Sequence, residues 1–210
     1  MVSAENDPRP VGTIWTLNLD EPVAGVTPLR PVTFRRAGPD LLPTLVSTMD
    51  GVSSEELLKR FGKGRRCYTG WVGDQIVVYG WVSFEEEDIG ELNLCIRLLP
   101  GEAYIWDCAT IPTFRRNHLY SALLGNIIEE LRAEGLCRAW IGADFENKPS
   151  QQGISRAGFH HVADLVVARD VPAMQQIWVQ GQPGVSGPIV AEARRAFLNE
   201  RHRISKTISS

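Results

Sequence analysis

The feature that most constrains the fold is a strand-like segment that runs through a short turn into a long helix. The stretch WDCATIP ends at residue 112, and FRRNHLYSALLGNIIEELRAEG occupies residues 114–135. Apolar residues recur in the second stretch at four-residue spacing, which predicts a helix with one buried face: Leu119, Leu123, Ile127 and Leu131. Gly135 is suited to end that helix. A strand followed at once by a helix directs the unpaired N–H groups of the helix N-terminus to the mouth of a sheet.

Two arginines stand at the start of this predicted helix. Arg115 and Arg116 fall where we expect its first turn, and positive charge there opposes the helix dipole. Convergent amides at a helix N-terminus bind anions, and a diphosphate is their natural guest. Flanking arginines would strengthen such a site. The alternative is that both arginines only solvate the helix start, as surface arginines commonly do.

The remaining patterns predict a mixed α/β layer domain of about 140 residues. Hydrophobic alternation and turn signals place strands at 32–37, 66–84 (a hairpin around Gly73 and Asp74), 91–112 (two strands around Pro100 and Gly101), 137–145 and 160–170. Helices are expected at 39–51, at 53–64 with Ser53 or Ser54 as cap, from about Ser150 to Gly158, and at 188–204. The order is a strand, two helices, a four-strand meander, the long helix, a strand, a short helix and a strand.

The same patterns divide the chain into three segments. Residues 1–30 are proline-bearing and are interpreted as an N-terminal arm, of which 13–19 could add an edge strand. Residues 31–170 form the domain. Residues 171–210 form a C-terminal extension, whose helix carries an apolar set that would pack on the core or on a second subunit: Ile189, Ala193, Ala196 and Phe197.

Composition argues against several classes of protein. The 210 residues carry a net charge of −3, so there is no global basic field to recruit nucleic acid or an anionic membrane. The longest apolar run, IVVYGWVSF, is too short to span a bilayer, and the first residues lack the apolar core of a signal peptide. We therefore expect a cytoplasmic protein without a nucleic-acid or membrane partner.

The four cysteines argue against metal or disulfide chemistry. They form no CxxC pair and have no histidine at ligand spacing, which suits a reducing cytoplasm and predicts no metal site. All four fall in strand-like segments, where a cysteine is usually a small buried hydrophobe: Cys67, Cys95, Cys108 and Cys137.

Specific motifs connect the turn and helix to a known family. The sequence resembles the GNAT superfamily of acyl-CoA N-acyltransferases, whose motif is Arg/Gln-x-x-Gly-x-Gly/Ala after a strand ending in a Val-x-Pro-like segment. The matching run here is RRNHLY at 115–120, preceded by Thr110-Ile111-Pro112. A second signature matches Asn147, Ser150 and Gly158-Phe159, and FRRAGPDLLPTL resembles the family's first strand and helix. The resemblance covers residues 32–170 and extends to the order of elements.

The resemblance implies a mixed, mostly antiparallel twisted sheet flanked by helices, and acetyl-CoA as the acyl donor. In this family the strand before the turn is typically splayed from its neighbour, often by a bulge. Backbone amides from about Arg116 to Ser121 would hold the CoA pyrophosphate, and a free amide near Thr110 would polarise the thioester carbonyl. The residues that the resemblance assigns to CoA are Cys108, Ala109, Thr110, Arg115, Arg116, Asn117, His118, Leu119, Tyr120, Ser121, Asn147 and Ser150.

Two departures from the family pattern affect the expected chemistry. His118 and Tyr120 occupy positions that are usually small, where the backbone approaches the phosphates or adopts an unusual φ. Ile154 stands where many relatives carry a tyrosine that gives a proton to the leaving CoA thiolate. A thiol with a pKa of about 8.5 is a tolerable leaving group without a donor. A substitute donor is Tyr120, Tyr104 or Cys108.

The attacking amine must also lose a proton, so a carboxylate or water has to accept it. Asp107, on the strand beside the expected thioester, matches an acidic position seen in many relatives. Its alternative role is a structural hydrogen bond to a neighbouring loop. The run Glu85-Glu86-Glu87 is a second candidate, which we interpret as a solvated turn.

These observations favour an N-acetyltransferase that moves an acetyl group from acetyl-CoA to an amine by direct attack. The alternative is a CoA-binding sensor or interaction module that retains the fold without catalysis, as His118 and Ile154 suggest. The acidic run hints at a cationic amine or a basic peptide as the acceptor. Dimerisation is common among the proteins that the chain resembles, so we keep a homodimer as an alternative.

Overall fold

The computed structural model describes residues 8–92, 94–167 and 177–199, and it contains one large and one small sheet. The large sheet has eight strands in the order β10-β9-β1-β8-β7-β4-β3-β2. Their bounds are β1 Arg9–Asn18, β2 Thr33–Ala37, β3 Arg66–Val72, β4 Gln75–Ser83, β7 Glu102–Thr110, β8 Arg138–Asp144, β9 His160–Val167 and β10 Ile177–Gly181. The small sheet joins β5 Glu86–Ile89, β6 Leu94–Arg97 and β11 Phe197–Asn199. Every recorded pairing is antiparallel except that of β7 with β8.

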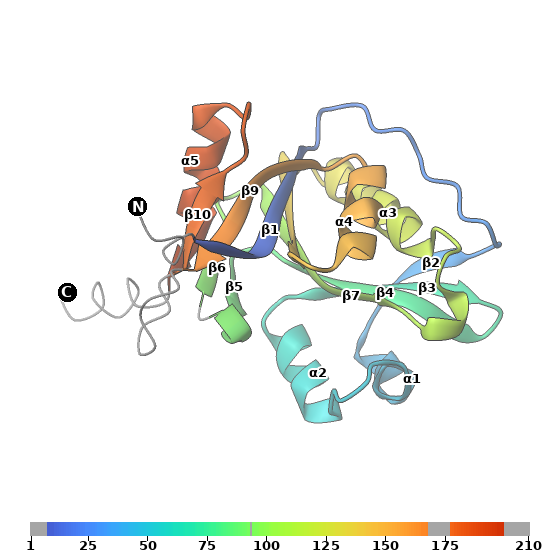
Figure 1. Cartoon of the computed structure of the whole chain (residues 1–210). Helices are drawn as coiled ribbons and strands as arrows, with labels where there is room; N and C mark the ends of the chain where they lie inside the picture. The colour runs from blue at the N-terminus through green and yellow to red at the C-terminus, as the bar shows by residue number, and fades with distance from the viewer. Residues whose placement is uncertain (1–7, 93, 168–176, 200–210) are drawn as a thin grey trace.

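Helices cover both faces of the large sheet (Figure 1). They are α1 Leu42–Thr48, α2 Ser54–Gly62, α3 Leu119–Ala133, α4 Lys148–Arg156 and α5 Gly187–Ala196, with short 3-10 turns at Pro39–Leu41, Gly90–Leu92 and Pro112–Phe114. Helices α3 and α4 lie on one face, and α1 and α2 lie on the other. The expected mixed, mostly antiparallel sheet flanked by helices is therefore confirmed. In the described part of the chain, no helix combines the length and apolar character needed to cross a membrane.

The long helix α3 forms for the reasons that its sequence predicts. Its four-residue apolar series is buried in the core cluster that also contains residues of β3, β4 and β7. Burying one such leucine or isoleucine contributes about 1.5–3 kcal/mol. Gly135 has a φ of 81° just beyond the helix, a left-handed conformation that glycine adopts readily. At α2, the Ser53 side chain accepts a hydrogen bond from the Glu56 N–H at 3.2 Å, so the expected cap is confirmed.

The N-terminal strand lies inside the sheet, not at its edge. Strand β1 pairs with β9 on one side and with β8 on the other, and Ile14 and Leu17 are buried. The interpretation of this stretch as mostly an arm with an edge strand is therefore wrong for residues 9–18. The chain then crosses over α3 and α4 before it enters β2 (Figure 1), and Leu29 N–H bonds to the Asn117 carbonyl at 3.0 Å. The division at residues 30 and 170 stays a prediction.

The expected four-strand meander is also wrong. Strands β3, β4 and β7 are neighbours, but β5 and β6 leave the large sheet and pair with each other. Part of the acidic run forms β5, because Glu87 is buried against the Arg65 guanidinium at 2.5 Å. A paired carboxylate can occupy a strand position inside the protein, whereas an unpaired one would remain in solvent.

The predicted C-terminal helix is shorter than expected. Helix α5 ends at Ala196, and Phe197 then starts a strand that pairs with Ile96. Residues 200–204 of the predicted helix lie outside the described residues. The apolar face of α5 packs on the core through Val190, Ala193 and Ala196.

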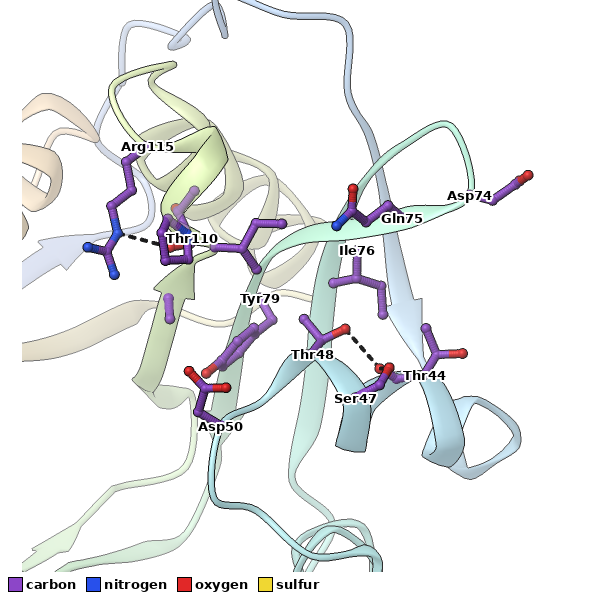
Figure 2. A pocket seen from close by; sticks show the side chains of 13 residues that line it. Thr44, Ser47, Thr48, Asp50, Asp74, Gln75, Ile76, Tyr79, Thr110 and Arg115 are labelled. Carbon is purple, nitrogen blue, oxygen red and sulfur yellow. Dashed lines mark hydrogen bonds between the residues drawn. The ribbon is translucent and has the colours of Figure 1, made fainter.

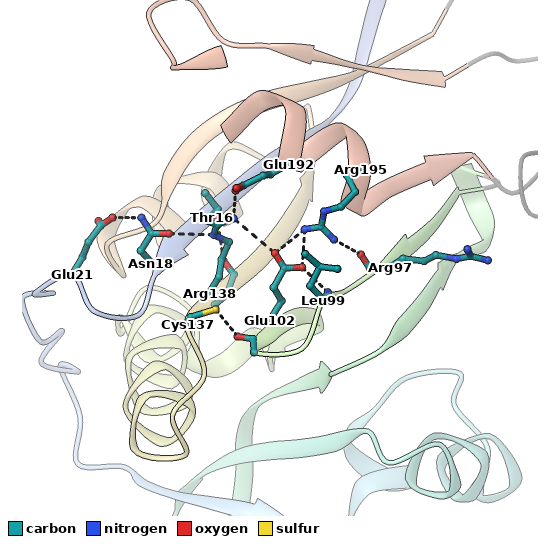
Figure 3. A network of polar contacts seen from close by, with 12 residues as sticks. Thr16, Asn18, Glu21, Arg97, Leu99, Glu102, Cys137, Arg138, Glu192 and Arg195 are labelled. Carbon is teal, nitrogen blue, oxygen red and sulfur yellow. Dashed lines mark hydrogen bonds and ion pairs between the residues drawn. The ribbon is translucent and has the colours of Figure 1, made fainter. Parts of the chain in front are cut away.

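A buried carboxylate attaches α5 to the sheet (Figure 3). Glu102, at the start of β7, is 5% exposed and accepts hydrogen bonds from Arg195 of α5 at 2.7 and 2.8 Å. It also accepts one from the Leu99 N–H at 2.8 Å. Arg138 lies 3.8 Å from the same carboxylate and pairs with Glu192. The ion-paired carboxylate therefore ties α5 to the first residue of the strand that carries the candidate site.

Replacing Glu102 should destabilise the protein more than replacing its exposed neighbour. We expect Glu102→Gln to lower the free energy of unfolding by about 2 kcal/mol, because two partly buried guanidinium groups lose their counter-charge. Urea denaturation measures this change. The control is Glu192→Gln. The Glu192 side chain is 41% exposed, so this substitution should lower the free energy of unfolding by less than about 1 kcal/mol. Equal losses in the two variants would contradict a special role for Glu102.

Candidate functional site

The candidate site begins where the parallel pair β7–β8 separates. The two strands pair only from Glu102 to Ile105 and from Arg138 to Ile141. Beyond that point β7 stays paired with β4 as far as Thr110, and β8 stays paired with β1 as far as Asp144. The outer backbone edge of residues 106–110 therefore faces a gap in the sheet. Such an edge can accept an extended ligand as if it were another strand.

A β-bulge lies at this separation. The register between β4 and β7 shifts between Tyr79 and Trp81, so Asp107 and Cys108 together lie opposite Gly80. Asp107 has a φ of 43°, which is unusual for a residue with a side chain. A Cβ atom on Gly80 would lie 2.6 Å from the Cys108 sulfur, so any side chain at position 80 would have to displace that sulfur. The expected splayed strand with a bulge is confirmed.

The bulge leaves the N–H of Thr110 directed into the gap. The Ile111 N–H bonds to the Val77 carbonyl of β4 at 3.0 Å. Successive residues of a strand direct their backbone groups to opposite sides, so the N–H of Thr110 points away from β4. Its carbonyl accepts a hydrogen bond from Arg115 Nε at 3.3 Å. A donor aimed at a gap beside a turn is suited to polarise a carbonyl group.

The turn between β7 and α3 has an unusual backbone. Arg116 has a φ of 62° and His118 a φ of 58°, both in the left-handed region. Helix α3 begins at Leu119, so the two arginines precede it and do not occupy its first turn as expected. A left-handed residue followed by a helical one turns successive N–H groups into a concave anion-binding nest. The Asn117 side chain stabilises the turn by donating to the carbonyls of Phe114 at 3.1 Å and Arg115 at 3.0 Å.

Tyr120 packs between α3 and α4. Its hydroxyl lies 3.4 Å from the Ser150 Oγ atom, and a Cβ on Gly153 would meet its ring at 2.5 Å. Ile154, at the position where relatives carry tyrosine, is fully buried in the core. Burial raises the pKa of Tyr120 above the ordinary range, so its hydroxyl holds its proton at neutral pH. The structure thus brings Tyr120 and Ser150 together beside the start of α4.

The other two candidate proton donors lie in different environments. Cys108 packs next to the α3 core cluster, whereas Tyr104 belongs to the second core cluster, where its ring lies 6.0 Å from that of Phe197. Burial raises the pKa of both groups. Only Cys108 shares the α3 cluster with Tyr120.

Asp107 forms an ion pair that the sequence did not indicate. Its carboxylate contacts the guanidinium of Arg60, which extends from α2. Arg60 in turn lies over the ring of Trp106 at 4.8 Å and that of Trp81 at 5.3 Å. The ion pair therefore fixes the bulge to α2. The apolar pattern of α2 contains no signal for Arg60, because the contact depends on how the helix packs on β7.

Glu87 is not part of a solvated turn, so that interpretation is wrong. It is 4% exposed and accepts hydrogen bonds from Arg65 and from the Ser83 hydroxyl, both at 2.5 Å. Ser83 accepts one from the Trp106 indole at 2.8 Å. Burial raises the pKa of Glu87, while Ser83 and Arg65 oppose that rise. Its two oxygens are committed to structural partners.

The remaining residues that the sequence singled out, Asn147 and the cysteines, have mainly structural roles. Asn147 caps α4 by accepting a hydrogen bond from the Ser150 N–H at 3.1 Å. Cys67 and Cys95 are buried as expected, but Cys137 is exposed, so the expectation of burial is wrong there. Within the described ranges no cluster of three histidine, cysteine, aspartate or glutamate side chains could hold a metal ion.

A cleft of about 480 Å³ opens beside the end of β7 (Figure 2). Its wall includes residues of α1, the turn between β3 and β4, and Ala109 and Thr110 of β7. Arg115 lies at the end near the turn, and Tyr79 of β4 lies within the cleft. The cleft therefore adjoins the β7 segment that precedes the nest. Sequence reasoning missed it, because its walls come from segments far apart in the chain.

The open parallel pair, the bulge and the nest together are the arrangement expected of an acyl-CoA N-acyltransferase. The model of the Acetyltransferase (GNAT) family matches residues 45–159, more than half of the chain. The chain therefore belongs to the GNAT family. No curated protein matches it.

Solved structures with a similar fold come from several bacteria. A GNAT-family acetyltransferase from Colwellia psychrerythraea has 13% identity and a TM-score of 0.58, over 84% of this chain and 57% of that one. A GCN5-related N-acetyltransferase from Sphaerobacter thermophilus has 16% identity and a TM-score of 0.54, over 73% and 50%. A GNAT-family acetyltransferase from Streptococcus pneumoniae has 13% identity and a TM-score of 0.51, over 72% and 99%. At these identities the likeness concerns the fold, and the chain spans about half of the first two proteins.

Glycine at position 118 should make the folded protein more stable than histidine does. We expect His118→Gly to raise the free energy of unfolding by about 0.5 kcal/mol, because relief of left-handed strain exceeds the entropy cost of glycine. Thermal or urea unfolding measures this change. Arg115→Gly is the matched control: with a φ of −61°, glycine there should lower stability by about 0.5–1 kcal/mol. A loss of stability in His118→Gly would show that the imidazole makes a stabilising contact.

Proposed function

We propose that the protein is an N-acetyltransferase that moves the acetyl group of acetyl-CoA to an amine by direct attack. The observation that carries the proposal is the continuity of the open edge of β7 with the nest at 116–119. An extended thioester arm can pair with the open edge while its phosphates occupy the nest. Membership of the GNAT family supports an acyltransferase in general, and the donor and acceptor are our inference.

Backbone groups would bind most of the donor. Amides from Arg116 to Ser121 would hold the pyrophosphate, and Arg115 and Arg116 would add positive charge. The backbone of Cys108, Ala109 and Thr110 would pair with the pantetheine arm. Asn147 and Ser150 would contribute indirectly, because the Asn147 cap sets the start of α4. Backbone recognition tolerates side-chain changes, so His118 is compatible with this role as long as its left-handed φ is retained.

The reaction needs a neutral amine, an oxyanion donor and a route for two protons. The amine nitrogen attacks the thioester carbonyl carbon, and the Thr110 N–H stabilises the developing oxyanion. The carbon–sulfur bond then breaks, the CoA sulfur receives one proton, and the new amide nitrogen loses one. The products are an N-acetylated amine and free CoA.

Tyr120 is the best-supported proton donor to the CoA sulfur. Its hydroxyl is protonated at neutral pH, and Tyr120 packs against the same core cluster as Cys108 of the β7 segment that we assign to the thioester arm. Asp107 is the candidate acceptor of the amine proton, directly or through water, although one of its oxygens contacts Arg60. General acid or base help of this kind contributes roughly 10²–10⁴-fold to the rate.

The second candidate function is a CoA-binding sensor or interaction module. The replacement of the usual tyrosine by the buried Ile154 favours it, because no hydroxyl is then supplied at that position. Purified protein that binds acetyl-CoA but releases no thiol with any amine would support this alternative. A cytoplasmic location and the absence of nucleic-acid and membrane partners remain parts of the proposal, and a homodimer remains an alternative to a monomer.

Calorimetric titration with acetyl-CoA, CoA and dephospho-CoA tests the proposal directly. We expect one-to-one binding of acetyl-CoA in the micromolar range, and His118→Gly should bind equally well or better. A marked loss of affinity in His118→Gly would identify the imidazole as a phosphate contact. Absence of binding by all three compounds would rule out the acetyltransferase and the CoA sensor alike.

Substitution of the proton-handling side chains should lower turnover and leave donor affinity unchanged. We expect Tyr120→Phe and Asp107→Asn each to reduce kcat by about 10²-fold, because each removes one proton-transfer group. Thiol release at saturating acetyl-CoA measures turnover, and calorimetry measures binding. Tyr104→Phe is the control, because Tyr104 lies in the other core cluster. Unchanged turnover in either variant would exclude that side chain from proton transfer.

A further inference from the structure

The cleft beside β7 contains a tyrosine hydroxyl without a protein partner. Tyr79 is 8% exposed as a whole residue, and its hydroxyl, which opens into the cleft, makes no hydrogen bond among the described residues. A hydroxyl in that position is free to donate to a ligand or to accept from one. Figure 2 shows the hydroxyl end of Tyr79 next to the Asp50 carboxylate, inside the cleft. Burial, with smaller contributions from Asp107 and Asp50, raises the pKa of Tyr79 to about 12, which indicates that both carboxylates are near.

The α1 side of the cleft offers mainly hydrogen-bond acceptors. The hydroxyls of Ser47 and Thr48 each donate to the Thr44 carbonyl at 2.8 Å, so their oxygens are left to accept. Asp50, which follows α1, has no ion-pair partner in the described ranges of the chain. A wall of hydroxyl oxygens and a carboxylate matches an ammonium group, which has donors and a positive charge.

The charges in the cleft are separated along its length. Arg115 lies at the end near the nest, and Asp50 lies on the α1 side beside Tyr79 (Figure 2). Asp74 is at the rim, and its side chain points away from Tyr79. The Asp50 side would therefore repel the phosphates of a donor and attract a cation.

A cation held at Asp50 would lie next to the strand that we assign to the thioester. Ala109 and Thr110 of β7 line the same cleft. An ammonium group cannot attack a carbonyl, because it has no lone pair. A ligand that is held as a cation while it is acylated therefore needs a second, neutral amino group beside the cationic one, and a diamine is the simplest such molecule. A cleft of about 480 Å³ is in the range of small-molecule sites.

We propose that this cleft binds small molecules with at least two amino groups, one held as an ammonium ion by Asp50 and Tyr79 while the other is presented to the acyl donor. This inference rests on the proposed function and deepens it by naming the class of acceptor. It assigns Asp50 and Tyr79 to acceptor binding and leaves proton transfer to other groups.

The first test is calorimetric titration of the full chain with 1,4-diaminobutane in the absence of CoA. Asp50→Asn should bind the diamine about tenfold more weakly, because it loses a charge-assisted hydrogen bond. Asp40→Asn is the matched control, since Asp40 is exposed and does not line the cleft. Equal affinities in the wild type and Asp50→Asn would overturn the inference.

The second test separates a binding role for Tyr79 from a structural one. Tyr79→Phe removes only the hydroxyl, so it should weaken diamine binding several-fold. Its midpoint of thermal unfolding without ligand should be unchanged, because the hydroxyl opens into the cleft and makes no hydrogen bond to the described residues. A lower midpoint with unchanged diamine affinity would assign the hydroxyl to stability and would contradict its role in binding.

Turnover then tests the requirement for two amino groups. With acetyl-CoA, kcat/KM for 1,4-diaminobutane should exceed that for 4-amino-1-butanol at least tenfold, and Asp50→Asn should remove this preference mainly through KM. Equal use of the two amines, or a stronger preference for a lysine-containing peptide, would overturn the inference and leave the proposed function standing. Asp50-dependent diamine binding by a protein that binds no acetyl-CoA would support the cation site and overturn the proposed function.

Discussion

The structure of the site depends on the unequal pairing of β7. This strand is paired with β4 almost to its end, but with β8 over only four residues. Backbone N–H and C=O groups are obligatory hydrogen-bonding groups, so an edge that faces a gap inside the sheet must be satisfied by water or by a ligand. An extended amide-bearing chain satisfies it best, because it reproduces the spacing of a missing strand. The open edge thus favours an extended ligand through backbone groups alone, whatever side chains surround it.

The open edge is held in place from both faces of the sheet. On the α3 face, Gly80 leaves the space that the Cys108 sulfur occupies, and no other residue would do so without displacement. On the α2 face, Arg60 contacts Asp107 and stacks on Trp106 and Trp81. A bulge with a left-handed aspartate is a strained feature, which persists only when its surroundings fix it. The buried Glu87–Arg65 pair, linked to Trp106 through Ser83, extends that support to the small sheet.

Predictions from the sequence were correct where the interacting residues are close together in the chain, and they failed where those residues are far apart in it. Helix α3 and the β3–β4 hairpin were predicted well, because four-residue spacing and a Gly-Asp turn are local signals. The inner position of β1 in the sheet was not predicted, because its partner residues lie in β8 and β9, more than a hundred positions away along the chain. The same reason hid Arg60 and Asp50, which reach the site only through the packing of α2 and α1 on the sheet. The bulge and the turn were found because the family motif lies in one continuous stretch.

The two departures from the family motif have different physical consequences. His118 keeps the left-handed backbone that glycine normally provides, so the N–H groups of the nest retain their directions. The consequence of having histidine there is backbone strain. Ile154 removes a hydroxyl, but its burial in the core coincides with a tyrosine ring from α3 lying against Gly153 of the same helix. Gly153 makes room for that ring, and the Tyr120 hydroxyl then lies near Ser150 at the start of α4. A phenol is thus present beside α4, supplied by the facing helix. Because Tyr120 also belongs to the end of α3 next to the turn, the conformation of the nest and the position of this phenol are coupled.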